Sequence, residues 1–203
     1  MVVNHTENFS FPVIQIWSLP KQTLGDVIGI SHKKGAENMT KYLWKIGKRN
    51  IGYIGGKIRD NDRTTDRLNG FISQMKKFGQ KVEKTKIEEA QNFLIEDGAR
   101  CFKNLIKRCP NLDAIFVGSD ILAAGAIFEA QRNGINIPED LSIVGYDDAE
   151  ISRAILPSIT TVRVKAKDIG IRAGEIILSR LEGYDRPKII EEFSTEIIVR
   201  ESG

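Results

Sequence analysis

The sequence is poor in the residues that build metal centres and disulfide frameworks. Its 203 residues include only two cysteines and two histidines. His5 and His32 lie far apart, and no zinc-binding spacing such as C-x-x-C or H-E-x-x-H occurs. Cys101 and Cys109 fall in a segment that predicts one helix, where their spacing would separate them by roughly 12 Å, too far for a disulfide. We therefore expect reduced cysteines, no metal site and no cofactor.

Long apolar runs are also missing. The longest uncharged apolar segments, such as 114–119 and 142–146, are far shorter than the roughly 20 residues that cross a bilayer. The first residues contain neither the basic region nor the apolar region of an export signal. We therefore expect a cytoplasmic protein without a membrane partner.

Charge of one sign is not concentrated anywhere in the chain. Lysine and arginine total 30, aspartate and glutamate total 27, and the net charge is +3. A protein that holds nucleic acid through its phosphates usually has a clustered basic face, because each neutralised phosphate needs a cation. With 41% hydrophobic residues and six prolines, the composition indicates a globular protein and excludes a disordered or collagen-like chain.

Short apolar segments alternate with amphipathic segments of helical length, the pattern of an α/β protein whose parallel sheet is covered on both faces. The expected strands are 13–17, 27–30, 51–54, 84–87, 114–117, 142–146, 160–164 and 196–200. The expected helices are 34–46, 67–78, 97–108, 121–132 and 167–181. Four glycines stand where a left-handed residue would end a helix, and a proline ends the remaining one: Gly47, Gly79, Gly134, Gly183 and Pro110.

Polar residues follow three of the expected strands. Ligands of open parallel sheets bind beyond the carboxyl ends of the strands, and these ends carry Gly55-Gly56-Lys57, Gly118-Ser119-Asp120 and Asp147-Asp148. The glycines fit neither a P-loop nor a G-x-G-x-x-G fingerprint, and Ser119 lacks the G-x-S-x-G context of a nucleophile. Asp120 and Asp148 are most simply helix caps, whereas Asp147 could present a carboxylate to ligand hydroxyls.

Arg67 is among the first residues of its expected helix, where the helix dipole disfavours a cation. A specific partner for its guanidinium is therefore expected, either a ligand or a salt bridge. Together these features predict a ligand-binding α/β domain without visible catalytic apparatus.

Several segments, taken in this order, resemble the effector-binding region of the LacI/GalR (lactose-repressor/galactose-repressor) family of bacterial transcription regulators. They are 12–14, 47–56, 67–71, 137–148, 156–163 and 199–202, and the resemblance extends from about residue 11 to the C-terminus. It implies the periplasmic-binding-protein-like type I fold, in which two Rossmann-like lobes hold a small effector in their cleft, namely a sugar, a sugar phosphate or a purine-like molecule. It also implies a regulator rather than an enzyme.

The resemblance implies effector contacts on the C-terminal lobe at Arg67, Phe93, Ser119 and Asp147. Arginine and aspartate can bind vicinal hydroxyls or a polar base edge, and Phe93 can stack on the face of a sugar or purine. The alternative for Phe93 is an ordinary, partly buried aromatic residue.

Three positions depart from what the family often has. Trp17 stands where an acidic residue is frequent, Ser119 where asparagine is, and Val164 where glutamine is. Two of these changes replace hydrogen-bonding groups with apolar ones. They favour a less hydroxylated or more aromatic effector, with Trp17 stacked over a ring from the opposing lobe and Val164 also at the site.

The resemblance also implies how the chain is divided. Residues 31–163 and 183–203 correspond to a complete C-terminal, effector-binding lobe, and 1–30 and 164–182 to part of an incomplete N-terminal lobe. The helix-turn-helix headpiece that would bind operator DNA has no counterpart before Phe11. The surfaces that would form a homodimer, Ile121–Arg132 and Ala149–Leu156, are present.

Two other classes of protein remain possible from the sequence. A transport-type sugar-binding protein shares the fold but needs an export signal. An α/β enzyme, for example one acting on nucleotide sugars, is the third possibility, and Asp147→Asn would test it.

Overall fold

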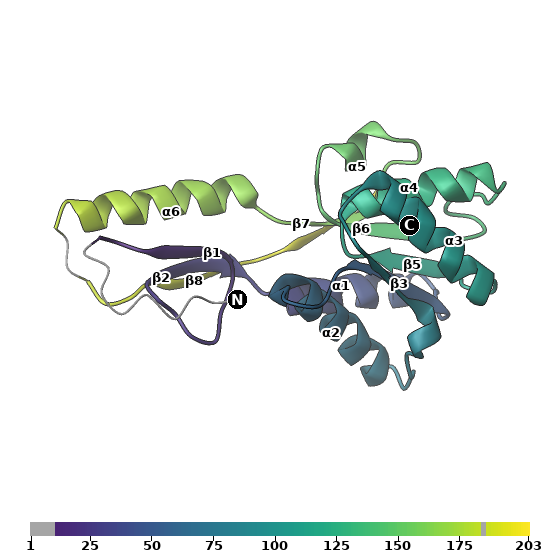
Figure 1. The fold of residues 1–203 in the computed structure, drawn as a ribbon, viewed down its shortest axis with the longest axis horizontal. Coiled ribbons are helices and arrows are strands. Elements are labelled where there is room, and N and C mark those ends of the chain that lie inside the picture. The colour runs from purple at the N-terminus through teal and green to yellow at the C-terminus, as the bar shows by residue number, and fades with distance from the viewer. Residues whose placement is uncertain (1–10, 184–185) are drawn as a thin grey trace. The chain divides into compact units, whose positions relative to one another are not determined.

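The computed structural model describes residues 11–183 and 186–203. The chain divides into two units (Figure 1). The smaller unit contains residues up to Ser31 together with Val164–Thr195, and the larger contains His32–Arg163 together with Glu196–Gly203. Within the described residues, no helix has the length and apolar character needed to cross a membrane.

The larger unit is built on a six-stranded sheet in the order β4-β3-β5-β6-β7-β9. All neighbouring strands are parallel except β7 and β9. Because β3, β5 and β6 are parallel neighbours, their carboxyl ends lie at one edge of the sheet. The strands are β3 (Ile51–Gly56), β4 (Ile87–Ala90), β5 (Ala114–Val117), β6 (Ser142–Asp147), β7 (Thr161–Arg163) and β9 (Glu196–Ile198).

Four long helices cover the two faces of this sheet. α1 (His32–Lys45) packs against α2 (Asp62–Lys77), and α3 (Ile95–Arg108) packs against α4 (Asp120–Arg132). The short segments η1 (Lys84–Lys86) and α5 (Ile151–Ala154) lie in the connections. This two-sided cover explains why β3 and β5 are buried along their whole length.

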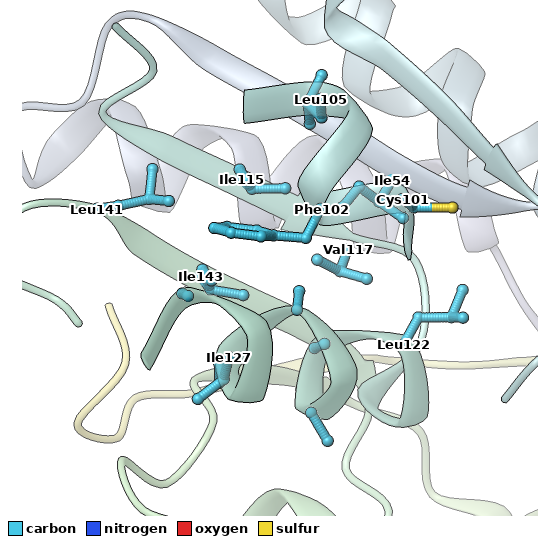
Figure 2. Packing of buried hydrophobic residues seen from close by; sticks show 14 of the residues in the cluster. Ile54, Cys101, Phe102, Leu105, Ile115, Val117, Leu122, Ile127, Leu141 and Ile143 are labelled. Atoms are coloured by element: carbon cyan, nitrogen blue, oxygen red, sulfur yellow. The ribbon is translucent and has the colours of Figure 1, made fainter. Parts of the chain in front are cut away.

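The alternation of side chains along β3 and β5 separates two apolar layers. Tyr53 of β3 faces α2, and its ring centroid is 5.4 Å from that of Phe71 on this helix. It is also 5.6 Å from the ring centroid of Phe116 on the neighbouring strand β5. On the opposite face, residues of the sheet pack with α3 and α4 in one buried cluster (Figure 2). It includes Ile54, Ile115, Val117 and Ile143 of the sheet, Cys101, Phe102 and Leu105 of α3, and Leu122 and Ile127 of α4.

Two glycines allow α3 and α4 to approach closely. A Cβ atom on Gly125 of α4 would lie 1.9 Å from the carbonyl oxygen of Ile95, and one on Gly98 of α3 would lie 2.1 Å from that of Leu122. Backbone oxygens have no freedom to move aside. Glycine is therefore required at both positions.

The smaller unit is a three-stranded parallel sheet with one helix. The strands β1 (Ile14–Ser18), β2 (Asp26–Ile30) and β8 (Ile190–Phe193) pair in the order β1-β2-β8. α6 (Ala166–Leu181) packs against β1 and β2. The Asp26 carboxylate accepts two hydrogen bonds from Arg180, at 2.8 and 2.9 Å, which tie the helix to the sheet.

Most of the expected elements are present. The five long helices are confirmed, as are seven of the eight strands. The four helix-ending glycines have φ between 71° and 95°, and α3 ends before Pro110. Both cysteines are free, as expected.

Three expectations about the fold were wrong. The strand expected at 84–87 is a 3-10 turn, and strand β4 follows it. α2 begins at Asp62, capped by the side chain of Asn61, so Arg67 is not in its first turn. Residues 183–195 were assigned to the larger lobe, but β8 pairs with β2 in the smaller unit.

We predict that Gly125→Ala destabilises the chain by about 3 kcal/mol, because the new methyl group forces α3 and α4 apart. The midpoint of urea denaturation measures this loss. Gly174→Ala in α6 is the control, since its Cβ would meet no atom within 4 Å. That variant should gain about 1 kcal/mol from helix propensity. Equal midpoints for Gly125→Ala and the wild type would contradict the proposed packing constraint.

Candidate functional site

The candidate site lies in the larger unit, where β3, β5 and β6 end side by side. β3 ends at Gly56, β5 is followed by Gly118 and Ser119, and β6 ends at Asp147. The pairing of Ile54 with Val117 aligns the ends of β3 and β5. The polar residues that the sequence placed after three separate strands are thus brought to one edge.

Arg67 reaches this edge from α2 and is only 6% exposed. Its Cζ lies 4.9 Å from the centroid of the Tyr146 ring, which attracts the cation through its electron-rich face. Its Nη1 lies 3.5 Å from Nδ1 of His32, which accepts because the guanidinium can only donate. Among the described residues, no carboxylate forms an ion pair with Arg67. A specific environment was expected for Arg67, but the reason given, a position in the first helical turn, was wrong.

Asp147 ends β6 with a φ of 109°, a region that L-residues rarely occupy. Burial raises the pKa of its carboxyl to about 6, although the guanidinium groups of Arg67 and Arg63 oppose the rise. Within the described ranges, no side chain donates a hydrogen bond to this carboxylate. Backbone strain of this kind is concentrated at functional sites. Asp147 is therefore an acceptor held in place but left without a partner from its own unit.

Phe93 and Ser119 border the same edge. The Phe93 ring lies over the end of β3, since a Cβ on Gly56 would be 2.2 Å from its Cζ. The ring is 41% exposed, so one part of it is open to a ligand. Ser119 is buried at the N-cap of α4, and its side chain makes no capping hydrogen bond.

Trp17 and Val164 belong to the smaller unit. Trp17 is the fourth residue of β1 and has a φ of 81°, unusual for a bulky side chain. Val164 directly follows β7 and is buried. The structure thus places four of the six expected site residues together and the other two in the second unit.

Asp120 does not cap α4, contrary to the expectation from sequence. Its Oδ1 accepts the Thr161 hydroxyl at 2.6 Å, and its Oδ2 accepts the backbone N–H of Ala149 at 2.7 Å. A Cβ on Gly145 would lie 2.1 Å from Oδ1, so glycine makes room for the carboxyl. Burial raises its pKa to about 7, against the effect of these two hydrogen bonds. Asp120 joins α4 to β7 and to the loop after β6.

Asp148 is not a helix cap either. Its carboxylate accepts Nε of Arg163 at 2.6 Å and Nη2 of Arg200 at 2.5 Å, and the Ser152 hydroxyl at 3.2 Å. Desolvation would raise its pKa, but the two arginines outweigh it and hold the pKa below the ordinary value. The two residues that directly follow Asp147 are therefore both anchored, Asp148 by two arginines and Ala149 by Asp120.

Three residues at the site were missed from the sequence: His32, Tyr53 and Tyr146. All three are buried on the α1–α2 face of the sheet, around Arg67. Two signals in the sequence could have found the tyrosines. The two-residue period of β3 puts Tyr53 on the same face as Gly55, and Tyr146 is the last residue but one of β6. Their aromatic character concealed this, since it is also typical of a core.

The arrangement of these residues is suited to binding a small ligand. It combines a buried cation, a partly buried carboxyl group and an exposed aromatic face. These groups suit the hydroxyls and the apolar face of a small ring. Among residues 11–183 and 186–203, no group of three or more His, Cys, Asp or Glu side chains is placed to hold a metal ion.

A parallel α/β sheet with polar and aromatic residues gathered at the carboxyl ends of its strands is typical of a small-molecule binding protein. Residues 40–203 match the periplasmic binding protein-like domain, and because this is most of the chain, the chain belongs to that family. Within that class it is a LacI-family effector-binding region. A LacI family transcriptional regulator from Silicibacter pomeroyi is 31% identical with a TM-score of 0.86, over 95% of this chain and 70% of that one.

Other relatives are regulators as well. The HTH-type transcriptional repressor PurR of Pasteurella multocida is 30% identical over 94% of this chain and 56% of its own length. The transcriptional regulator CelR, solved as a complex with cellobiose, is 25% identical with a TM-score of 0.85, over 94% of this chain and 58% of that one. The chain thus spans a little over half the length of these two relatives.

We predict that Asp120→Asn changes how stability depends on pH. The folded-state pKa of Asp120 is raised from 3.8 to about 7, so the folded wild type binds a proton more tightly than the unfolded chain. Between these values its free energy of unfolding falls as the pH rises, by up to about 1.4 kcal/mol per pH unit. The amide of asparagine can accept from Ala149 and donate to Thr161 without titrating.

Urea denaturation at pH 5, 6, 7 and 8 measures the effect. The advantage of Asp120→Asn over the wild type should grow with pH up to about 7 and then level off. Asp60→Asn is the control, because the Asp60 carboxylate is exposed and its variant should follow the wild type. Parallel curves for Asp120→Asn and the wild type would contradict the assignment.

Proposed function

We propose that the chain is the effector-binding core of a LacI-type transcriptional regulator, and that a small sugar or related molecule binds at the strand ends of the larger unit. One observation carries this proposal: Arg67 is buried near the end of β6, where its charge acts on the Asp147 carboxyl, and within the described residues neither side chain forms an ion pair. A cation and a carboxyl group so placed can respectively donate to and accept from ligand hydroxyls. The cellobiose complex of CelR supports a sugar as the ligand.

The regulatory part of the proposal concerns the whole protein. A ligand can alter DNA binding only through different affinities for two arrangements of the regulator. We propose that Trp17 and Val164 of the smaller unit also take part in ligand binding. Operator DNA would be bound by a headpiece outside this chain, in the cytoplasm.

A homodimer is the second proposed partner. The expected surfaces, Ile121–Arg132 and Ala149–Leu156, include Leu156, which is 77% exposed. Ile121 and Phe128 line an apolar groove of about 590 Å³ together with Phe93 and Leu94, so Phe93 borders both this groove and the ligand edge. Such a groove on a regulator that acts on paired DNA half-sites favours a second copy as its occupant.

A transport-type sugar-binding protein and an enzyme are less well supported. The relatives named above are transcriptional regulators. No group at the site forms a nucleophile–base pair of the kind that hydrolases use, within the part of the chain that the structure describes.

Thermal shift with a panel of pentoses, hexoses, sugar phosphates and purines tests the ligand site. A ligand at one hundred times its dissociation constant should stabilise the protein by about 2.7 kcal/mol. Arg67→Ala and Asp147→Ala should abolish the shift given by the best ligand, because each removes a charged hydrogen-bonding group from the site.

Lys107→Ala is the matched control for these variants. Lys107 is exposed in the last turn of α3, and the start of that helix, not its end, adjoins the site. This variant should keep the full shift. Retention of the full shift by both site variants would refute the assignment of Arg67 and Asp147.

Leu156→Asp tests the proposed dimer. A charge on this exposed apolar side chain should raise the dissociation constant by about tenfold or more, because it must be desolvated in the interface. Sedimentation velocity measures the change. Ile46→Asp, which changes a 40% exposed side chain outside the proposed surfaces, should leave the dimer intact. A wild-type monomer at micromolar concentration would rule out this interface.

A further inference from the structure

The hydroxyl of Tyr53 reaches the ligand edge because two glycines leave room for it. The ring passes over Gly55, where a Cβ would lie 2.7 Å from Cε1 of Tyr53 and 3.1 Å from Oη. The hydroxyl continues to Gly118, where a Cβ would lie 2.9 Å from Oη. A residue in the middle of β3 thus places its polar atom beyond Val117, where β5 ends.

This hydroxyl is buried without a hydrogen bond. Tyr53 is 1% exposed, and among the described residues its Oη has no partner. Nε of Arg67 is also buried without a hydrogen-bond partner among the described residues. A Cβ on Gly118 would lie 3.7 Å from that nitrogen. Two unpartnered polar atoms therefore flank one glycine at the ligand edge. Buried polar groups in native proteins are almost always satisfied by protein, water or ligand.

The chemistry of the two atoms defines the partner they lack. The Nε–H of arginine can only donate, and burial raises the pKa of the Tyr53 phenol, which keeps its proton available for donation. Both atoms therefore suit one acceptor oxygen. The Asp147 carboxyl at the end of β6 supplies the opposite function and suits a donor. A ring with adjacent hydroxyls offers an acceptor and a donor side by side, whereas a phosphate or carboxylate would bring negative charge towards Asp147.

We propose that Tyr53 is a specificity-determining residue of the ligand site, and that its hydroxyl and the Nε–H of Arg67 donate to one oxygen of a neutral, hydroxyl-rich ligand. This inference rests on the proposed function of the site. It adds a contact from inside the sheet to those from the strand ends. It also selects neutral sugars over sugar phosphates, and it departs from the less hydroxylated effector that the changes at Trp17 and Val164 favoured.

Tyr53→Phe tests the contact, because it removes the hydroxyl and keeps the ring against Phe71 and Phe116. The probes for calorimetric titration are D-ribose, D-glucose and cellobiose, their mono-deoxy analogues, and ribose 5-phosphate. For the neutral sugar that binds the wild type best, the variant should bind about five- to tenfold more weakly.

The deoxy analogues locate the ligand atom. In the wild type, one analogue should lose affinity because it lacks the oxygen that Tyr53 and Arg67 contact. In Tyr53→Phe the same analogue should lose less, since one of the two donors is already gone. Equal losses in both proteins would overturn the contact.

Thermal denaturation without ligand separates binding from structure. The melting temperature of Tyr53→Phe should equal or exceed that of the wild type, because an unpartnered buried hydroxyl contributes no protein hydrogen bond. Tyr42→Phe is the control: its hydroxyl donates to the carbonyl oxygen of Gly203 at 2.7 Å, so this variant should melt lower and bind the sugar unchanged. A lower melting temperature for Tyr53→Phe would assign its hydroxyl a structural role and overturn the proposal.

The outcomes distinguish the two proposals. If sugars bind the wild type and Tyr53→Phe equally well, the site stands and the role of Tyr53 is refuted. If no neutral sugar binds the wild type, or ribose 5-phosphate binds better than all of them, the neutral-sugar assignment is refuted. If no member of the larger panel binds, the proposed function fails as well.

Discussion

The buried carboxyl group of Asp120 is the constraint on which the geometry of the ligand edge depends. Through Thr161 and Ala149 it joins the start of α4, strand β7 and the loop that follows β6. Gly145 must be a glycine for this carboxyl to fit. Because Asp148 is anchored as well, by Arg163 and Arg200, the backbone that follows β6 has little freedom, and Asp147 ends the strand with a φ of 109°.

The α/β architecture was predictable, because it follows from local patterns, and the same patterns led to the candidate site. Strand and helix periods located most elements, and the rule for parallel sheets pointed to Ser119 and Asp147. Phe93 became a candidate only through the resemblance to the LacI/GalR family. Strand β8 was not predicted, because two of its four residues are glutamates and because it pairs with β2, which lies far away in the sequence.

The errors at the site share one physical cause. An aspartate before a helix normally caps it, yet Asp120 and Asp148 bond to groups that come together only when the sheet forms. The same limit applies to Tyr53, whose strand pattern predicts a core residue. Only the three-dimensional neighbourhood, with one glycine in β3 and another directly after β5, shows that its buried hydroxyl lies at the ligand edge.

The two tryptophans of the chain fall one in each unit, Trp17 in β1 and Trp44 in α1. Trp44 stacks on Phe78 with a centroid distance of 4.4 Å and is covered by the Arg49 guanidinium, so its surroundings are fixed by its own unit. Among the residues that the structure describes, neither an aromatic ring nor a cation stacks on Trp17. Intrinsic fluorescence therefore contains two separable signals: replacing either indole with phenylalanine leaves an optical reporter for one unit alone.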